Sequence, residues 1–112
     1  MRMPSLNRPL LLEERARASD GAGGFTETWT PLGTLWAELK AGSGREKGEG
    51  LATLSLAHYR ITVRAAPHGA PSRPKADQRF RDGTRIFRIL AVLEAGHDGR
   101  FLQCNVVEEV VA

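Results

Sequence analysis

Apolar and polar residues alternate along much of the chain. In residues 59–65 (YRITVRA) every second residue is apolar, so one face of an extended strand would point into a core. Residues 86–93 are apolar on both faces except at Arg88, which is typical of a central strand. Residues 101–111 are β-branched and apolar, and residues 25–39 are rich in Thr and Trp. The pattern predicts an all-β fold, a small antiparallel β-barrel or sandwich.

Turn signals separate these segments. Residues 20–24 (DGAGG) are a glycine-rich turn, and the Asp-Gly pairs at 82–83 and 98–99 each suit a tight turn. The pair at 98–99 has apolar segments on both sides, as a β-hairpin has. Pro31 and Gly33 interrupt the Trp-rich segment and predict a bulge or bend there.

Four segments do not follow the strand pattern. Residues 10–18 favour a helix by propensity alone. Residues 42–50 (GSGREKGEG) predict a mobile loop, and residues 51–58 are compatible with a short helical turn. Residues 66–76 contain three prolines and predict a second irregular loop. We therefore expect two long loops and at most a short helix, and loops of this size usually carry function.

The length and composition of the chain limit the kinds of protein that it can be. The chain has 112 residues, 41% apolar and 26% charged, which predicts a single globular domain over residues 1–112. No stretch approaches the roughly 20 apolar residues of a membrane span, and the N-terminus does not resemble a secretory signal. We expect no membrane contact and synthesis in the cytoplasm. Cys104 is the single cysteine, so no internal disulfide can form, and we expect a small buried hydrophobe there.

Positive charge is concentrated in the middle of the sequence. Between residues 60 and 88, eight basic residues face two acidic ones, giving this third of the chain a charge of +6. The remainder holds eight basic and eleven acidic residues, a charge of −3. A positively charged segment of this kind can face a polyanion or a neighbouring subunit's acidic surface, or it can be a solvated face. It lacks interleaved surface aromatics, which disfavours single-strand binding, whereas contact with duplex phosphates stays open.

The sequence offers no persuasive active site. The three histidines, at 58, 68 and 97, have no Cys or carboxylate at metal-ligand spacing, so we expect no metal and no cofactor. The serines lie outside any nucleophile-elbow context, and the glycines of residues 42–50 lack the ending of a phosphate loop. We therefore expect no catalytic residues and no enzymatic activity.

Several short motifs, taken in order, resemble those of a known family. They are residues 20–24 leading into 25–29 (FTETW), 35–37 (LWA), 59–64 (YRITVR), 82–83 with 85–89 (RIFRI), and 102–104 (LQC). Their order and spacing over residues 10–108 resemble the phage head–tail joining (head-closure) family of siphophages, prophages and gene transfer agents. The sequence departs from the family pattern after Arg64, where Ala65 and Ala66 replace the usual aromatic.

The resemblance implies a small β-barrel subunit of a phage or phage-like particle, assembled in the bacterial cytoplasm. The subunit would form a homo-oligomeric ring at the head–tail joint, with a portal or adaptor ring above and tail-terminator or tail proteins below. The ring would surround packaged double-stranded DNA. The resemblance also implies that residues 10–18 form a strand, against their local helix propensity. In this family a loop between the early and middle strands can project into the channel.

Seven residues are candidates for contacts in such a ring. In residues 42–50, Arg45 and Lys47 would place positive charges near DNA phosphates, and Arg73 and Lys75 in the second loop are further DNA-channel candidates. Residues 66–76 are a candidate contact with a neighbouring ring. The interface candidates are Trp29, Pro71 and Pro74. Core packing is the preferred interpretation for Trp36.

Two other functions remain open at this point. The chain could be a tail-completion or tail-terminator ring protein, which also uses small β-barrels. It could also be a free-standing nucleic-acid-binding β-barrel, which the +6 middle permits. A free-standing binder would hold DNA as an isolated monomer, whereas a connector subunit would bind weakly until assembled.

Overall fold

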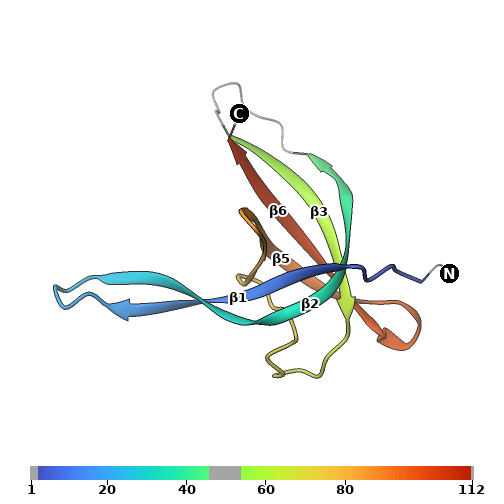
Figure 1. Ribbon diagram of the computed structural model, residues 1–112, viewed down its shortest axis with the longest axis horizontal. Coiled ribbons are helices and arrows are strands. Elements are labelled where there is room, and N and C mark those ends of the chain that lie inside the picture. The colour runs from blue at the N-terminus through green and yellow to red at the C-terminus, as the bar shows by residue number, and fades with distance from the viewer. Residues whose placement is uncertain (1–2, 46–53, 112) are drawn as a thin grey trace.

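The computed structural model describes residues 3–45 and 54–111, in which six β-strands close into an antiparallel barrel (Figure 1). The elements are β1 (Arg8–Ser19), β2 (Phe25–Arg45), β3 (Leu54–Arg64), β4 (Arg79–Asp82), β5 (Arg85–Ala95), the 3-10 turn η1 (His97–Gly99) and β6 (Phe101–Val111). Around the barrel the strands follow the order β1-β2-β3-β6-β5-β4. The predicted all-β antiparallel barrel is confirmed. The described part of the chain contains no helix with the length and apolar character needed to span a membrane.

Strand β1 covers the segment whose local preference is helical. Leu10 and Leu12 alternate with more exposed neighbours and point inward with no exposed surface. The strand pairs with β2 along its whole length and with β4 at residues 11–13. Two leucines with a period of two gain more from burial in the barrel than the helix propensity of Glu, Arg and Ala can offset. The strand implied by the family resemblance is confirmed.

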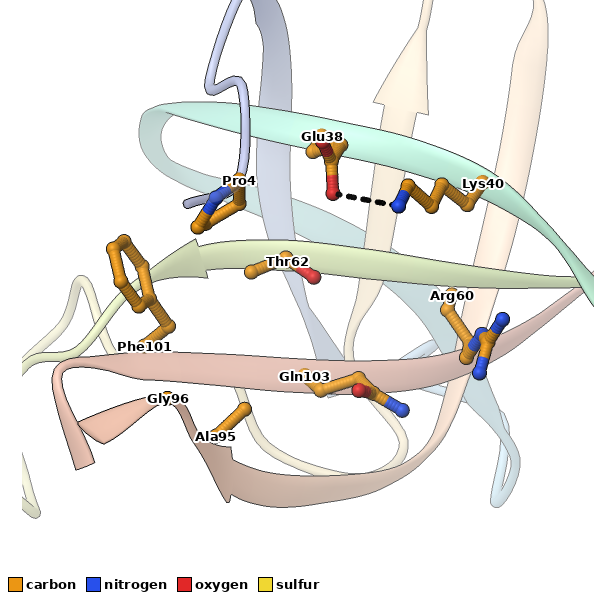
Figure 2. A pocket seen from close by; sticks show the side chains of 9 residues that line it. All are labelled: Pro4, Glu38, Lys40, Arg60, Thr62, Ala95, Gly96, Phe101 and Gln103. Carbon is orange, nitrogen blue, oxygen red and sulfur yellow. Dashed lines mark ion pairs between the residues drawn. The ribbon is translucent and has the colours of Figure 1, made fainter. Parts of the chain in front are cut away.

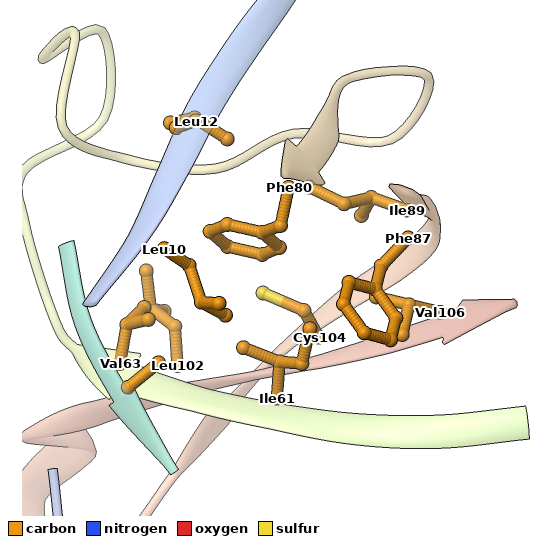
Figure 3. Packing of buried hydrophobic residues seen from close by; sticks show 11 residues of the cluster. Leu10, Leu12, Ile61, Val63, Phe80, Phe87, Ile89, Leu102, Cys104 and Val106 are labelled. Atoms are coloured by element: carbon orange, nitrogen blue, oxygen red, sulfur yellow. The ribbon is translucent and has the colours of Figure 1, made fainter. Parts of the chain in front are cut away.

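The core fills the inside of the barrel with side chains from all six strands (Figure 3). Its largest members, Phe80 and Phe87, are a cross-strand pair of β4 and β5. Ile61 and Val63 point inward from β3, as their alternation predicts. Cys104 is fully buried among them, and this burial raises the pKa of its thiol to about 12. The prediction of a small buried hydrophobe at Cys104 is confirmed.

Strand β5 departs from the prediction of a strand buried on both faces. Phe87 and Ile89 fill the core, whereas Leu90 and Leu93 are 47% and 52% exposed. A barrel made from one closed sheet buries its inner face, so the outward residues meet solvent. The same reason corrects the expectation for Trp36, which is 57% exposed because Ala37, its neighbour in β2, holds the inward position.

The predicted loop at residues 42–50 is wrong in its first part. Strand β2 continues through Gly42 to Arg45, and Arg45 pairs with Ala57 after a bulge that begins at Ala41. Gly42 suits this bulge because a Cβ atom there would lie 3.1 Å from the His58 carbonyl oxygen. Residues 46–50 lie outside the described residues. Strand β3 begins at Leu54, which also overturns the helical turn over residues 54–58.

Strands β1 and β2 extend beyond the barrel as a two-stranded arm, formed by residues 14–19 and 25–30 (Figure 1). Leu12 pairs with Gly33 and Glu13 with Pro31, so Leu32 is an extra residue that makes a β-bulge where the arm begins. Gly33 has a φ of 140°, which a residue with a side chain adopts only under strain. The predicted bulge near Pro31 and Gly33 is confirmed, and the DGAGG turn closes the far end of the arm.

Candidate functional site

The second loop, residues 66–76, is irregular as predicted but firmly attached to the barrel. The Arg73 Nη1 donates to the Ala66 carbonyl at 2.8 Å, and the Asp77 N–H donates to the Ile89 carbonyl at 3.0 Å. The Lys75 N–H donates to Gln78 Oε1 at 2.9 Å, and the Lys75 Nζ lies 3.9 Å from Glu14 Oε1. Arg73 and Lys75 therefore hold the loop in place in addition to any role toward DNA.

The two interface prolines of this loop differ in their surroundings. Pro71 is exposed and available to a neighbouring molecule. Pro74 is fully buried within the subunit. Pro74 thus fixes the path of the chain, and Pro71 is the member of the pair that a partner can touch.

The two candidate DNA-contact pairs do not come together. Arg45 ends strand β2 at one end of the barrel, whereas residues 66–76 lie at the other end (Figure 1). Lys47 lies outside the described residues. Contact with DNA by the end of β2 and contact with DNA by the second loop are therefore two separate hypotheses.

Half of the eight basic residues in the positive middle of the sequence lie against carboxylates of the acidic flanks; they are Lys75, Arg79, Arg81 and Arg85. The Arg79 Nε donates to Glu13 Oε1 at 2.6 Å, with both side chains mostly buried, and Arg81 lies 3.6 Å from the same oxygen. Arg85 binds Glu108 through two hydrogen bonds of 2.8 and 3.0 Å. Donation of these hydrogen bonds to the Glu108 carboxylate raises the pKa of Arg85 above its ordinary value. These ion pairs therefore offset part of the positive charge of residues 60–88.

Trp29 lies at the base of the arm, half-buried between two arginines. The Arg79 guanidinium lies 4.0 Å from the centre of the ring, and the Arg15 guanidinium lies at 5.4 Å. These cation–π contacts tie the arm to β4. A groove of about 620 Å³ opens beside this stack, and its lining includes Leu56, Ile86 and Val107. The sequence marks Trp29 as an anchor, but the arginines that hold it come from distant segments.

A second groove crosses the outer face of the sheet formed by β2, β3 and β6 (Figure 2). It has a volume of about 240 Å³, and Lys40, Arg60, Thr62 and Gln103 project into it. The Lys40 Nζ lies 3.8 Å from Glu38 Oε1. The polar positions that alternate with the core residues of β3 are the sequence signal for this surface. Its hydrogen-bonding groups suit a polar partner surface.

The comparisons with known proteins agree with this architecture. The family model described as phage head completion protein matches residues 1–109. A solved chain from the "Virion of native gene transfer agent (GTA) particle" is 53% identical, with a TM-score of 0.85 over 98% of this chain and 100% of that chain. No curated protein matches the sequence. The resemblance found from short motifs is confirmed: the chain belongs to the phage head completion protein family.

Proposed function

We propose that the chain is a structural subunit of the head–tail connector ring of a tailed phage or a gene transfer agent-like particle. In this role it closes the DNA channel after packaging and offers a docking surface to the tail. One observation carries the proposal: 53% identity, over nearly the whole of both chains, to a chain from a gene transfer agent virion. Such identity over full length implies a similar place in a similar particle.

A structural role agrees with the physical character of the surface. The charged groups at the barrel's arm-side end are engaged with each other, as Arg79 is with Glu13 and Arg85 with Glu108. Groups held in this way fix the shape of the subunit. Both grooves are lined by polar and apolar side chains together, which suits contacts with other protein subunits.

The partners that follow are other copies of the chain, a portal or adaptor ring above, tail-terminator or tail proteins below, and duplex DNA in the lumen. A ring of identical subunits needs two different lateral surfaces that fit each other head to tail. Its DNA contact needs positive charge repeated around the ring and no sequence readout. Arg45 and Lys47 are the residues we assign to that contact, with Arg73 and Lys75 as the second position.

The test is electron microscopy of particles from a producing cell whose gene for this chain carries an early stop codon. We expect tailless heads, many emptied of DNA, beside free tails. Supplying the intact gene from a plasmid should restore joined particles, which controls for effects on neighbouring genes. Full heads joined to normal tails without the protein would overturn the proposal.

A further inference from the structure

The outer face of the sheet formed by β2, β3 and β6 carries five polar side chains whose positions follow from the strand register. Lys40 of β2 lies opposite Arg60 of β3, and Arg60 lies opposite Asn105 of β6. Two residues further along β3, Thr62 lies opposite Gln103. The residues that alternate with them along the strands belong to the core or pack against it, so these five side chains point outward. We call them the outer cluster.

Most of the outer cluster is available to another molecule. Among the residues that the structure describes, four of its members have no side-chain hydrogen bond or ion pair; they are Arg60, Thr62, Gln103 and Asn105. Arg60 is also exposed, whereas the guanidinium groups of Arg79 and Arg85 are bound to carboxylates. The charge of Arg60 and the donor groups around it are therefore free to bind a partner outside the subunit.

A groove runs along the outer cluster toward the end of β2. Its first part, of about 240 Å³, is the groove of Figure 2, which Lys40, Arg60 and Gln103 line. A second hollow, of about 470 Å³, shares Arg60 and Gln103 with the first and reaches Gly42, while Leu90 borders it on the β5 side. Gly42 is the first residue of the segment that the proposed function assigns to DNA contact. The groove thus connects the outer cluster with that segment.

The chemistry of the groove favours an anionic partner that is rich in acceptor oxygens. Arg, Lys, Thr, Asn and Gln are the side chains that commonly donate to phosphate oxygens. Among the described residues that line the two hollows, Glu38 is the one carboxylate. It already accepts from the Ser5 N–H at 2.9 Å and lies 3.8 Å from the Lys40 Nζ. Two cations, Lys40 and Arg60, against this carboxylate leave a charge of +1, which Arg60 presents to the outside.

The backbone of duplex DNA is the anion that fits such a surface in a ring. One positive charge per copy is weak on its own, but a ring repeats it around the lumen. Duplex DNA carries a negative charge for about every 1.7 Å of its axis, so its backbone can meet the repeated charges. Hydroxyl and amide donors bind phosphate oxygens without reading the base sequence, as a channel that passes any DNA requires.

We propose that the outer cluster lies against the phosphate backbone of duplex DNA in the lumen of the ring, with Arg60 as the principal charge. This inference rests on the ring of the proposed function and names the face of the subunit that lines its channel. The outer face of β2, β3 and β6 then turns toward the axis of the ring. Contact with DNA extends along the groove from the end of β2 to the outer cluster.

A photo-cross-linking group in the outer cluster tests the contact in assembled particles. Lys40 is replaced with p-benzoylphenylalanine, which leaves Arg60 in place, and purified particles are irradiated. We expect a covalent adduct of this chain with DNA, detected by nuclease digestion, end-labelling of the remaining nucleotides and gel electrophoresis. The matched control carries the same group at Thr34, an exposed position of the same strand outside the groove, and should give no DNA adduct.

Charge reversal gives a second measurement that does not depend on the cross-linking chemistry. Arg60→Glu should lower the fraction of DNA-filled particles about threefold, because every copy would set a carboxylate against the phosphates. Arg17→Glu makes the same change of charge at an exposed position of the arm and should leave the DNA content unchanged. Gel electrophoresis of the joined particles checks that each variant chain is incorporated.

The outcomes separate this contact from the proposed function. Joined particles that contain the chain, give no DNA adduct from position 40 and keep their DNA with Arg60→Glu would overturn the assignment of this face and leave the proposed function standing. An adduct with another particle protein in place of DNA would also overturn it, because the face would then be a contact between proteins. Joined particles that assemble without the chain would refute the proposed function itself.

Discussion

Arg79 joins three parts of the molecule through one side chain. It donates to the buried Glu13 carboxylate at 2.6 Å and stacks on the Trp29 ring at 4.0 Å, while its own strand, β4, closes the barrel. Without Arg79, the buried Glu13 carboxylate would keep only the more exposed and more distant Arg81, and most of the compensation of its charge would be lost. The planar guanidinium also covers the indole face, which a lysine ammonium does not do in the same way.

Replacing Arg79 with Met should therefore destabilise the subunit by about 3 kcal/mol, as expected for breaking a mostly buried ion pair. The measurement is urea unfolding followed by tryptophan fluorescence. Arg81→Met is the matched control, because Arg81 is more exposed and leaves the Arg79–Glu13 pair intact. Its cost should stay below about 1 kcal/mol. Equal costs for the two variants would contradict this account.

The burial of a single side chain could be predicted from the sequence where one local property decides it. The alternation of residues 59–65 fixes which side of the strand faces the core, and a lone cysteine on an apolar segment is usually a small buried hydrophobe; Ile61 and Cys104 are both buried. Trp36 was not predictable in this way, because a large aromatic among Thr and Leu fits either face of a strand. Its exposure follows from Ala37, whose small side chain takes the inward position against the core.

At the scale of elements, the strands and turns follow from the sequence, but the arm does not. Alternation and Asp-Gly turns indicate where strands run and where they reverse. They do not indicate whether a strand stays in the barrel along its whole length. Similarly, the glycines at 42 and 44 predicted a loop, whereas pairing of Arg45 with Ala57 extends β2 through them. Long-range pairing overrides local preference in both cases.

The arm should be separable from the barrel. A variant in which residues 16–28 are replaced by Asn-Gly, joining Arg15 to Trp29 through a tight turn, should keep the β-sheet circular-dichroism spectrum. Its Tm should change by less than about 5 °C, because the core cluster contains no residue from the deleted segment. Phe80→Ala, which empties the core, is the contrasting variant and should cost about 3–5 kcal/mol. A truncated chain that fails to fold would show that the arm supports the barrel.

At the scale of the whole molecule, the distribution of charge in the folded subunit differs from its distribution along the sequence. The basic middle and acidic flanks approach each other in space, as Arg85 does with Glu108 and Lys75 with Glu14. The net charge of +3 remains, but half of the basic residues in the +6 segment are engaged in ion pairs with the acidic flanks. Sequence alone could not show this, because pairing depends on which strands become neighbours. DNA contact in a ring then depends on charges repeated from copy to copy.

The variant Arg45→Glu/Lys47→Glu tests that contact in whole particles. Each copy would lose two positive charges and gain two negative ones, so we expect the fraction of DNA-filled particles to fall about tenfold or more. The measurement is DNA content by negative-stain microscopy and nuclease protection. Arg45→Lys/Lys47→Arg keeps the charge and should behave as the unaltered protein. Full retention of DNA in the reversed variant would refute the assignment of residues 42–50 to the channel and leave Arg73 and Lys75 as the position to test.

The arm also bears on how the free subunit survives before it is assembled. The barrel closes on itself, but the outer backbone edges of residues 14–19 and 25–30 have no neighbouring strand in the described part of the chain. Open edges of this kind recruit strands from other molecules and promote aggregation. Arg15, Arg17 and Glu27 place charges along the ribbon, and Pro31 removes a backbone donor at its base. Charges and a missing donor at these positions disfavour the pairing of a strand from another molecule with the open edges of the arm.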